Sequence, residues 1–324
     1  MTAAPAGHGT HALALDAGQT TTKARLTRAD GTVVDRSYPG VRTHEPLLPQ
    51  LAAIARDAHR EFDLPLHTVA FGSSGLTDAD ADAAQLLAAL RGIGTHRVLL
   101  AHDSVTSFLG ALGHARGAVV AAGTGVVTMA VGRERVARVD GWGHLMGDAG
   151  SAYWIGRQAL ETAMRAYDGR AAETALLDVV RARWPRVDQA YASLQADPDR
   201  VRVIASFAQA VSELAPTDAA AADISRRAAE ELARSVVVAL ERVDDADGAD
   251  EAVCMLGGVF RADAIRERVA GLVTAARPHA SVRPPVGSGV DGVAMLPSLP
   301  PEHPLQAAVS GAETGERGGE PHDR

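Results

Sequence analysis

The sequence predicts an α/β protein of two lobes, and three observations support this prediction. A chain of 324 residues with 46% hydrophobic composition is long enough to bury two cores. Strand-like stretches near residues 66–71, 97–102 and 252–256 alternate with helical patterns, which is typical of parallel strands in an α/β sheet. The third observation is a repeat, because a strand, a glycine-containing turn and two further strands occur twice along the chain.

The first copy of this arrangement lies near the start of the chain. Residues 11–15 alternate apolar with smaller side chains and end at Asp16, and KARLTR and TVVDRSY then complete a predicted antiparallel meander. The turn after the first strand contains Gly18, Thr20 and Thr21. Backbone N–H groups and hydroxyls of this kind can surround phosphate oxygens, because glycine lets the backbone approach closely. Asp16 is suited to Mg²⁺, held through water, since hard cations prefer carboxylate oxygen.

The second copy begins with GAVVAA at residues 117–122. This strand leads into Gly123, Thr124 and Gly125, and VVTMAVG and RVARVDG follow as two further strands. An ordinary hairpin turn is the alternative for either turn alone, but two phosphate-type turns are harder to obtain by chance. We therefore expect the lobes to face each other across a cleft that holds a nucleotide.

Gly257 and Gly258 form another small-residue turn, which follows a predicted strand and precedes a predicted helix. Their bare backbone could let a purine or a ribose lie against the chain. A plain strand-to-helix turn is the alternative interpretation.

Two aspartates lie where a predicted helix begins, so each has two interpretations. Asp103 follows the strand RVLLAH, and it could cap the next helix or accept a proton from a hydroxyl during phosphoryl transfer. Asp148 could cap the helix SAYWIGRQAL or hydrogen-bond the hydroxyls of a sugar. His144 is predicted to be a structural histidine, because no cluster at metal-ligand spacing surrounds it, and we expect no zinc.

The lobes are predicted at residues 10–114 and 115–298, with a helical insertion at about 151–243 in the second lobe and a last helix that returns toward the first. Residues 1–9 and 299–324 are rich in Pro, Gly, Ala and charged residues and lack periodicity, so both are predicted to be disordered.

Composition excludes several classes of function. A net charge of −8 argues against a nucleic-acid partner, because such partners require a basic face. Cys254 is the single cysteine, so no disulfide framework or cysteine-ligated cluster can form within one chain. The N-terminus lacks the pattern of a signal peptide, and no stretch of about 18 apolar residues predicts a membrane span. We expect a cytoplasmic protein without a membrane partner.

The segment 141–156, GWGHLMGDAGSAYWIG, resembles the GWGHxxGDEGSxYWI pattern of the N-acetylglucosamine kinase branch of the BadF/BadG/BcrA/BcrD ATPase family. This family belongs to the sugar kinase, Hsp70 and actin superfamily, and the similarity extends from about Leu13 to about Leu296. The resemblance implies a two-lobed actin-like ATPase fold, which is ribonuclease H-like, with a nucleotide cleft between the lobes. It also implies phosphorylation by ATP and Mg²⁺ of a hydroxyl, O6, of an amino sugar such as N-acetylglucosamine, by a homodimer.

The resemblance also implies roles for individual residues. Asp103 would be the catalytic base, and Gly257 and Gly258 would border the adenosine. The expected phosphate-binding residues are Asp16, Gly18, Thr20, Thr21, Gly123, Thr124 and Gly125. The expected sugar-binding residues are Ser74, Gly75, Asp103, Gly141, Trp142, Gly143 and Asp148, together with His44.

The sequence departs from the family pattern at specific positions. Ala149 replaces the usual Glu of the GDEG run, and the first turn has one glycine where three are common. Related hexosamine kinases use an asparagine after the third strand, but this chain contains no asparagine. Thr43, His44 or Glu45 must take its place, with His44 as our sugar-binding candidate, or the substrate differs.

Three alternative functions follow from these departures and from the fold. One is a kinase of glucosamine or another modified hexose. A more remote one is a non-catalytic ATP- or sugar-binding sensor, because a fold alone does not establish function. The third, a dehydratase activator with an iron–sulfur cluster, is excluded because a cluster shared by two subunits needs two cysteines from each.

Overall fold

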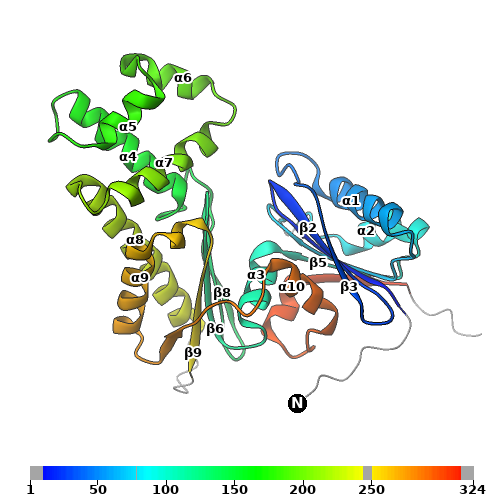
Figure 1. The fold of residues 1–324 in the computed structure, drawn as a ribbon. Coiled ribbons are helices and arrows are strands. Elements are labelled where there is room, and N and C mark those ends of the chain that lie inside the picture. Colours follow the sequence, from blue (N-terminus) through cyan, green and yellow to red (C-terminus); the bar gives the residue numbers. More distant parts are fainter. Residues whose placement is uncertain (1–9, 78, 244–249, 315–324) are drawn as a thin grey trace, which may run out of the picture. The chain divides into compact units, whose positions relative to one another are not determined.

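The chain folds into two compact units (Figure 1). The computed structural model describes residues 10–77, 79–243 and 250–314. The first unit contains the described residues up to His114 together with 286–314, and the second contains those from Ala115 to Pro285. Residues 286–298, which the sequence analysis assigned to the second lobe, therefore lie in the first unit.

Among the described residues of the first unit, six strands form one sheet. They are β1 (Ala12–Ala17), β2 (Thr21–Thr27), β3 (Val33–Pro39), β4 (Thr68–Ser73), β5 (Arg97–His102) and β11 (Val309–Glu313). Their order across the sheet is β11-β5-β4-β1-β2-β3. The predicted meander of β1, β2 and β3 is confirmed, and β1, β4 and β5 run parallel. The carboxyl ends of these three parallel strands therefore lie at one edge of the sheet.

Helices cover both faces of this sheet. They are α1 (Leu47–Phe62), α2 (Ala83–Leu90), α3 (Asp103–Leu112) and α10 (Gly289–Met295). Leu13 and Leu15 alternate along β1 and join one buried cluster with Leu51 of α1 and Leu86 of α2, as the two-residue period of a strand requires. On α10, a Cβ added at Gly292 would lie 1.8 Å from a backbone oxygen of α3. Glycine therefore lets α10 pack directly on α3.

The predicted disorder of residues 299–324 is wrong for the part that the structure describes, which reaches residue 314. A 3₁₀ helix at Pro304–Ala308 precedes β11, which pairs antiparallel with β5. Leu305 is fully buried, and Ser310 Oγ accepts a hydrogen bond of 3.3 Å from the backbone N–H of Ala83. Pairing with the edge of β5 orders this segment. Its small side chains form no sequence pattern that predicts this pairing. Residues 1–9 and 315–324, also predicted to be disordered, lie outside the described residues.

The second unit repeats the core of the first sheet. Its strands are β6 (Gly117–Ala122), β7 (Val126–Val131), β8 (Val136–Asp140), β9 (Glu251–Leu256) and β10 (Ala280–Val282). The order is β10-β9-β6-β7-β8, in which β6, β7 and β8 form an antiparallel meander and β9 and β10 run parallel to β6. The internal repeat predicted from the sequence is thus a repeat of topology.

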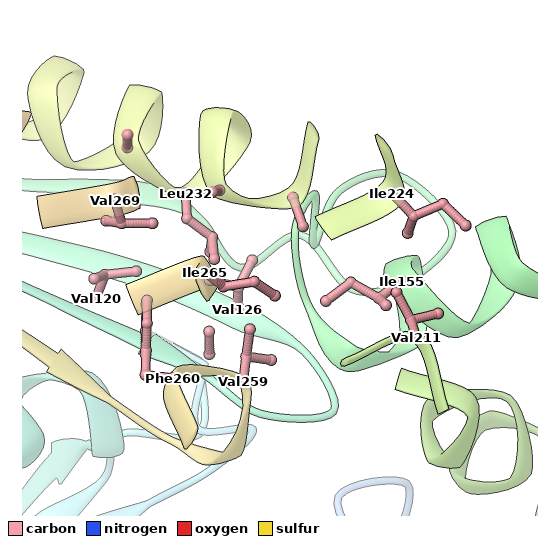
Figure 2. Packing of buried hydrophobic residues seen from close by; sticks show 14 of the residues in the cluster. Val120, Val126, Ile155, Val211, Ile224, Leu232, Val259, Phe260, Ile265 and Val269 are labelled. Atoms are coloured by element: carbon pink, nitrogen blue, oxygen red, sulfur yellow. The ribbon is translucent and has the colours of Figure 1, made fainter. Parts of the chain in front are cut away.

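Most helices of the second unit lie in the predicted helical insertion at about 151–243, and one further helix follows β9. They are α4 (Ala152–Tyr167), α5 (Leu176–Arg183), α6 (Ala190–Ala196), α7 (Arg200–Leu214), α8 (Ala219–Val243) and α9 (Asp263–Ala276). Figure 2 shows Leu232 of α8 and Ile265 and Val269 of α9 packed beside Val120 and Val126 of the sheet, all within one buried cluster. Burial of this face fixes the β6–β7 hairpin, whose turn is the second predicted phosphate site.

Within the described parts of the chain, no helix is long and apolar enough to cross a membrane.

Candidate functional site

Polar residues gather at the carboxyl ends of β1, β4 and β5 in the first unit. Asp16 of β1 lies opposite Gly72 of β4, and the last residue of β4 lies opposite the last residue of β5. Asp103 is the first residue of α3, directly after β5, and its Oδ2 accepts a hydrogen bond from Ser74 Oγ. The parallel register thus brings Asp103 and Ser74, two predicted site residues, into contact.

Asp103 does not cap its helix, so that interpretation is wrong. The N-cap is His102, whose Nδ1 lies 3.1 Å from the backbone N of Ser104 and 2.9 Å from Asp103 Oδ1; without a proton this nitrogen accepts from the Ser104 N–H, and with a proton it donates to Asp103 instead. Burial raises the pKa of the Asp103 carboxyl, but hydrogen bonds from His102, Ser74 and the Ser104 backbone lower it by more, and the net pKa lies below the usual value. Asp103 is therefore a half-buried carboxylate that stays charged at neutral pH.

The second carboxylate of this edge, Asp16, has the opposite electrostatics. Burial and the negative charge of Asp103 raise its pKa to about 6, against a smaller lowering by Lys23. Its Oδ2 lies against the start of α10, where a Cβ added at Gly289 would come within 2.5 Å. The ionised form of Asp16 is therefore disfavoured unless a positive charge binds beside it.

The donor chemistry at Asp16 fits Mg²⁺. Hard cations take oxygen ligands, and Mg²⁺ usually keeps several waters and binds through one or two carboxylates. No group of three or more His, Cys, Asp or Glu side chains within the described residues could hold a metal ion. A single carboxylate such as Asp16 would fit a largely hydrated Mg²⁺, and binding through water stays a prediction.

The first predicted phosphate turn is held by backbone hydrogen bonds. Gly18 N–H donates to Thr21 O at 3.2 Å, and Gly18 O accepts from Val41 N–H at 3.0 Å. Ser74 N–H donates to Ala17 O at 3.1 Å, so the loop after β4 is joined to this turn. Thr20 and Thr21 are exposed, which leaves their hydroxyls accessible to a ligand.

The loop after β3, where the family asparagine is missing, approaches the Ser74 loop through one residue. Gly75 has a φ of 75°, and a Cβ added there would lie 2.6 Å from Thr43 Cγ2. The His44 side chain is 81% exposed and lies 3.8 Å from Glu45 Oε1. Of the three candidates for the missing asparagine, Thr43 is the one that contacts Gly75.

The second predicted phosphate turn, in the second unit, is supported by the start of α4. Gly123 N–H donates to Gly125 O at 2.9 Å and closes the turn. The N–H groups of Ala152 and Tyr153 donate to the carbonyls of Gly123 at 2.8 Å and Thr124 at 3.1 Å. The carbonyls of this turn are therefore satisfied inside the protein.

The Gly257 turn lies beside the second phosphate turn. Ala121 and Leu256 are paired in the parallel β6–β9 ladder, so both turns follow at the same edge of the sheet. Gly257 has a φ of 101°, and a Cβ added there would lie 2.2 Å from Ala122 O. Only glycine permits this approach, as the sequence analysis expected of a bare-backbone turn.

Asp148 is buried against the second turn and does not cap α4, so the capping interpretation is again wrong. Ser151 is the cap, with its Oγ accepting from the Trp154 N–H at 3.2 Å. A Cβ added at Gly125 would lie 2.7 Å from Asp148 Oδ2. Burial raises the pKa of Asp148 by more than backbone hydrogen bonds such as that from Val126 lower it.

Asp140, at the end of β8, is a residue that the sequence analysis did not select. Its carboxylate accepts hydrogen bonds from the backbone N–H groups of Gly141 at 2.8 Å, Asp148 at 2.8 Å and Ala149 at 3.1 Å. Trp142, in the same loop, is 62% exposed. The Asp-Gly pair after a strand is a turn signal that could have drawn attention to Asp140.

The predicted site residues thus form two sets, one in each unit. The first set contains Asp16, Gly18, Thr20, Thr21, His44, Ser74, Gly75 and Asp103. The second set contains Gly123, Thr124, Gly125, Gly141, Trp142, Gly143, Asp148, Gly257 and Gly258. Whether one ligand engages both sets remains a prediction.

The two repeated sheets, each with a glycine-containing turn after its first strand, define the class of the protein as an actin-like ATPase fold. Residues 13–294 match the BadF/BadG/BcrA/BcrD ATPase family, and the chain belongs to this family.

Individual relatives agree with this assignment. An N-acetylmuramic acid/N-acetylglucosamine kinase of Clostridium acetobutylicum is 31% identical over 110 residues, which cover 33% of this chain and 36% of that protein. An N-acetyl-D-glucosamine kinase of Dictyostelium discoideum is 39% identical over 72 residues, 22% of this chain and 23% of that protein. The matched segments thus span about a third and a quarter of these curated relatives.

A solved structure extends the likeness to nearly the whole fold. A candidate N-acetylglucosamine kinase of Chromobacterium violaceum has a TM-score of 0.66 and 24% identity, and the match covers 89% of this chain and 98% of that one.

Proposed function

We propose that this protein transfers the γ-phosphate of ATP to a hydroxyl of an amino sugar, with O6 of N-acetylglucosamine as the acceptor. The observation that carries the proposal is the environment of Asp103, a carboxylate held in its charged form by His102 and Ser74. A positioned carboxylate can accept the proton of the attacking hydroxyl, and positioning is most of what phosphoryl transfer requires of a protein.

The other predicted residues receive roles that their surroundings support. Asp16 would bind Mg²⁺, which supplies positive charge to the transferring phosphoryl group. The turns after β1 and β6 would bind phosphate oxygens through threonine hydroxyls and through backbone N–H groups other than those of Gly18 and Gly123, which donate within their turns, and Gly257 and Gly258 would border the adenosine. Ser74, Gly75, Gly141, Trp142, Gly143 and Asp148 would contact the sugar. Thr43 is a better candidate than His44 for the position of the missing asparagine, because it contacts Gly75.

The names of the relatives support an acetylated amino sugar as the acceptor. One is an N-acetylmuramic acid/N-acetylglucosamine kinase and the other an N-acetyl-D-glucosamine kinase. Glucosamine and other modified hexoses are the alternatives, because the asparagine used by related hexosamine kinases is missing. A homodimer stays a prediction of the family resemblance, and a cytoplasmic location stays a prediction from the composition of the sequence.

The test measures ADP release with N-acetylglucosamine, N-acetylmuramic acid, glucosamine and glucose, and locates the phosphate on the product by NMR. Asp103→Asn should lower kcat by at least about 100-fold, because general-base catalysis contributes about 10²–10⁴. Asp57→Asn, an exposed aspartate of α1, is the matched control and should keep full activity.

Two results would contradict the proposal. Absence of turnover with every sugar, while ATP still binds, would remove the kinase function and favour a non-catalytic sensor. Full activity of the Asp103→Asn variant would remove the assigned base.

A dehydratase-activator function disagrees with the environment of the cysteine. Cys254 lies inside β9 and is fully buried, and burial raises the pKa of its thiol to about 11. A thiol must lose its proton to bind iron, so this residue is a poor ligand for a cluster.

A further inference from the structure

We propose that Asp140 is a positioning residue that holds the segment Gly141–Ala149, here called the acceptor loop, in the shape that binds the sugar. The sugar-binding part of this inference rests on the proposed function. The loop-holding part is a property of the protein alone and can be tested separately.

The carboxylate of Asp140 joins the two ends of the acceptor loop. Oδ1 accepts from the N–H of Gly141 at the start of the loop and from the N–H of Asp148 near its end, both at 2.8 Å. Oδ2 accepts from the N–H of Ala149 at 3.1 Å. Charged hydrogen bonds of this kind are stronger than neutral ones. One side chain therefore satisfies three backbone donors that are up to nine residues from it in sequence.

Hydrophobic burial cannot hold this loop, because its large apolar side chains lie in solvent. Trp142 is 62% exposed, Leu145 is 86% exposed and Met146 is 82% exposed. Apolar side chains that are this exposed contribute little to the stability of the loop. The ordering of the loop must therefore come from polar contacts and backbone geometry.

The polar contacts of the acceptor loop meet at Asp140 and Gly141, the two residues before Trp142. Arg138 Nη2 donates to Gly141 O at 2.7 Å, and its guanidinium lies 5.7 Å from the ring centre of Trp142. On the other side, a Cβ added at Gly147 would lie 2.4 Å from Asp140 Oδ1. The loop backbone thus closes directly around the carboxylate.

Two aspartates of this segment, Asp140 and Asp148, share an uncommon backbone conformation. Asp140 has a φ of 60° and Asp148 a φ of 61°, a left-handed region that non-glycine residues rarely adopt. The hydrogen bond from the Asp148 N–H holds Asp148 in this conformation, in which its carboxylate lies against Gly125. Asp140 therefore also sets the direction of Asp148, a predicted sugar ligand.

The experiment replaces the carboxylate without straining the backbone. Asp140→Gly removes both acceptor oxygens, and with them all three hydrogen bonds, and still adopts a positive φ freely, whereas Asp140→Asn with its oxygen at the Oδ1 position keeps an acceptor for two of the three donors. The matched control is Asp63→Gly, because Asp63 also has a positive φ, of 51°, but ends α1 as an exposed residue.

Hydrogen exchange tests loop holding, and kinetics test sugar positioning. In Asp140→Gly, exchange of the Gly141, Asp148 and Ala149 amides should accelerate at least about tenfold, because each loses its acceptor. The KM for the sugar should rise at least about tenfold, equivalent to about 1.4 kcal/mol, with a KM for ATP within about twofold. Asp140→Asn should show a smaller rise, and Asp63→Gly none.

The outcomes separate the inference from the proposed function. Unchanged exchange of these three amides in Asp140→Gly overturns the role of Asp140, whatever the activity of the wild type. Accelerated exchange with an unchanged KM for the sugar overturns the positioning role. If the wild type phosphorylates no sugar, the proposed function fails, and the exchange data still decide whether Asp140 holds the loop.

Discussion

The raised pKa of Asp16 makes a prediction about stability. Asp16 titrates at about 6 in the folded protein against an ordinary value of 3.8. Between these two pH values the folded state binds more protons than the unfolded state, so the free energy of unfolding falls as pH rises. A difference of about two pH units corresponds to about 3 kcal/mol, at about 1.4 kcal/mol per unit. Above pH 6 the charged Asp16 therefore destabilises the fold by up to about this amount.

Replacing Asp16 with Asn removes the charge at nearly constant shape. Asp16→Asn should match the wild type near pH 4 and be more stable near pH 8 by up to about 3 kcal/mol, which raises the unfolding midpoint by roughly 6–12 °C for a unit of this size. Thermal unfolding in EDTA at both pH values measures this difference. Magnesium chloride should raise the midpoint of the wild type, by supplying the missing positive charge, and leave that of the variant unchanged.

Asp57→Asn serves as the control, because it removes an exposed carboxylate of α1. An Asp16→Asn variant that is no more stable than the wild type at pH 8 would refute the electrostatic reasoning. A stabilised variant that also keeps full kinase activity would leave the electrostatics intact and refute the assignment of Mg²⁺ to Asp16.

Two further predictions concern the same unit. Ser74→Ala removes a hydrogen bond that lowers the pKa of Asp103, so the acid limb of the kcat–pH profile should move to higher pH, with kcat at neutral pH reduced several-fold; an unmoved limb would contradict the contact. Truncation after Ser298 removes β11 and the buried Leu305, and should lower the unfolding midpoint by several degrees, since loss of one such buried side chain costs about 2–5 kcal/mol. Truncation after Thr314 spares β11 and is the matched comparison; equal midpoints would show that β11 adds no stability.

Patterns local in sequence predicted the fold well. Both meanders could be recognised because strand alternation and glycine-containing turns occupy short consecutive stretches, 12–39 and 117–140. β11 could not be recognised, because VSGAE has little alternation and becomes a strand by pairing with β5, about 210 residues away in the chain. An edge that accepts a strand is a property of the folded sheet and has no local signal.

In the candidate site, too, local sequence patterns predicted some features, and others depend on the folded structure. Asp16 and Asp103 could be selected because each follows a predicted strand, but the opposite directions of their pKa shifts depend on burial and on contacts that the fold creates. The capping interpretations of Asp103 and Asp148 failed by one and three positions, because His102 and Ser151 have side-chain acceptors too. Asp140 was missed since its partners are backbone N–H groups, which any sequence provides.

The contrast between Asp16 and Asp103 argues for their separate roles in catalysis. Environments that shift the pKa values of two neighbouring carboxyl groups in opposite directions indicate different chemical roles for the two groups. A lowered pKa makes Asp103 a weaker base. In phosphoryl transfer with a loose transition state, however, the proton is released late, so the direction in which Asp103 holds the acceptor hydroxyl matters more than the basicity of its carboxylate. His102 and Ser74 fix both oxygens of Asp103, which supplies that direction. Asp16 is disfavoured as a free charge and therefore gains most from a bound cation. Under the proposed function, the disfavoured charge of Asp16 would recruit Mg²⁺, and the hydrogen-bonded charge of Asp103 would orient the acceptor.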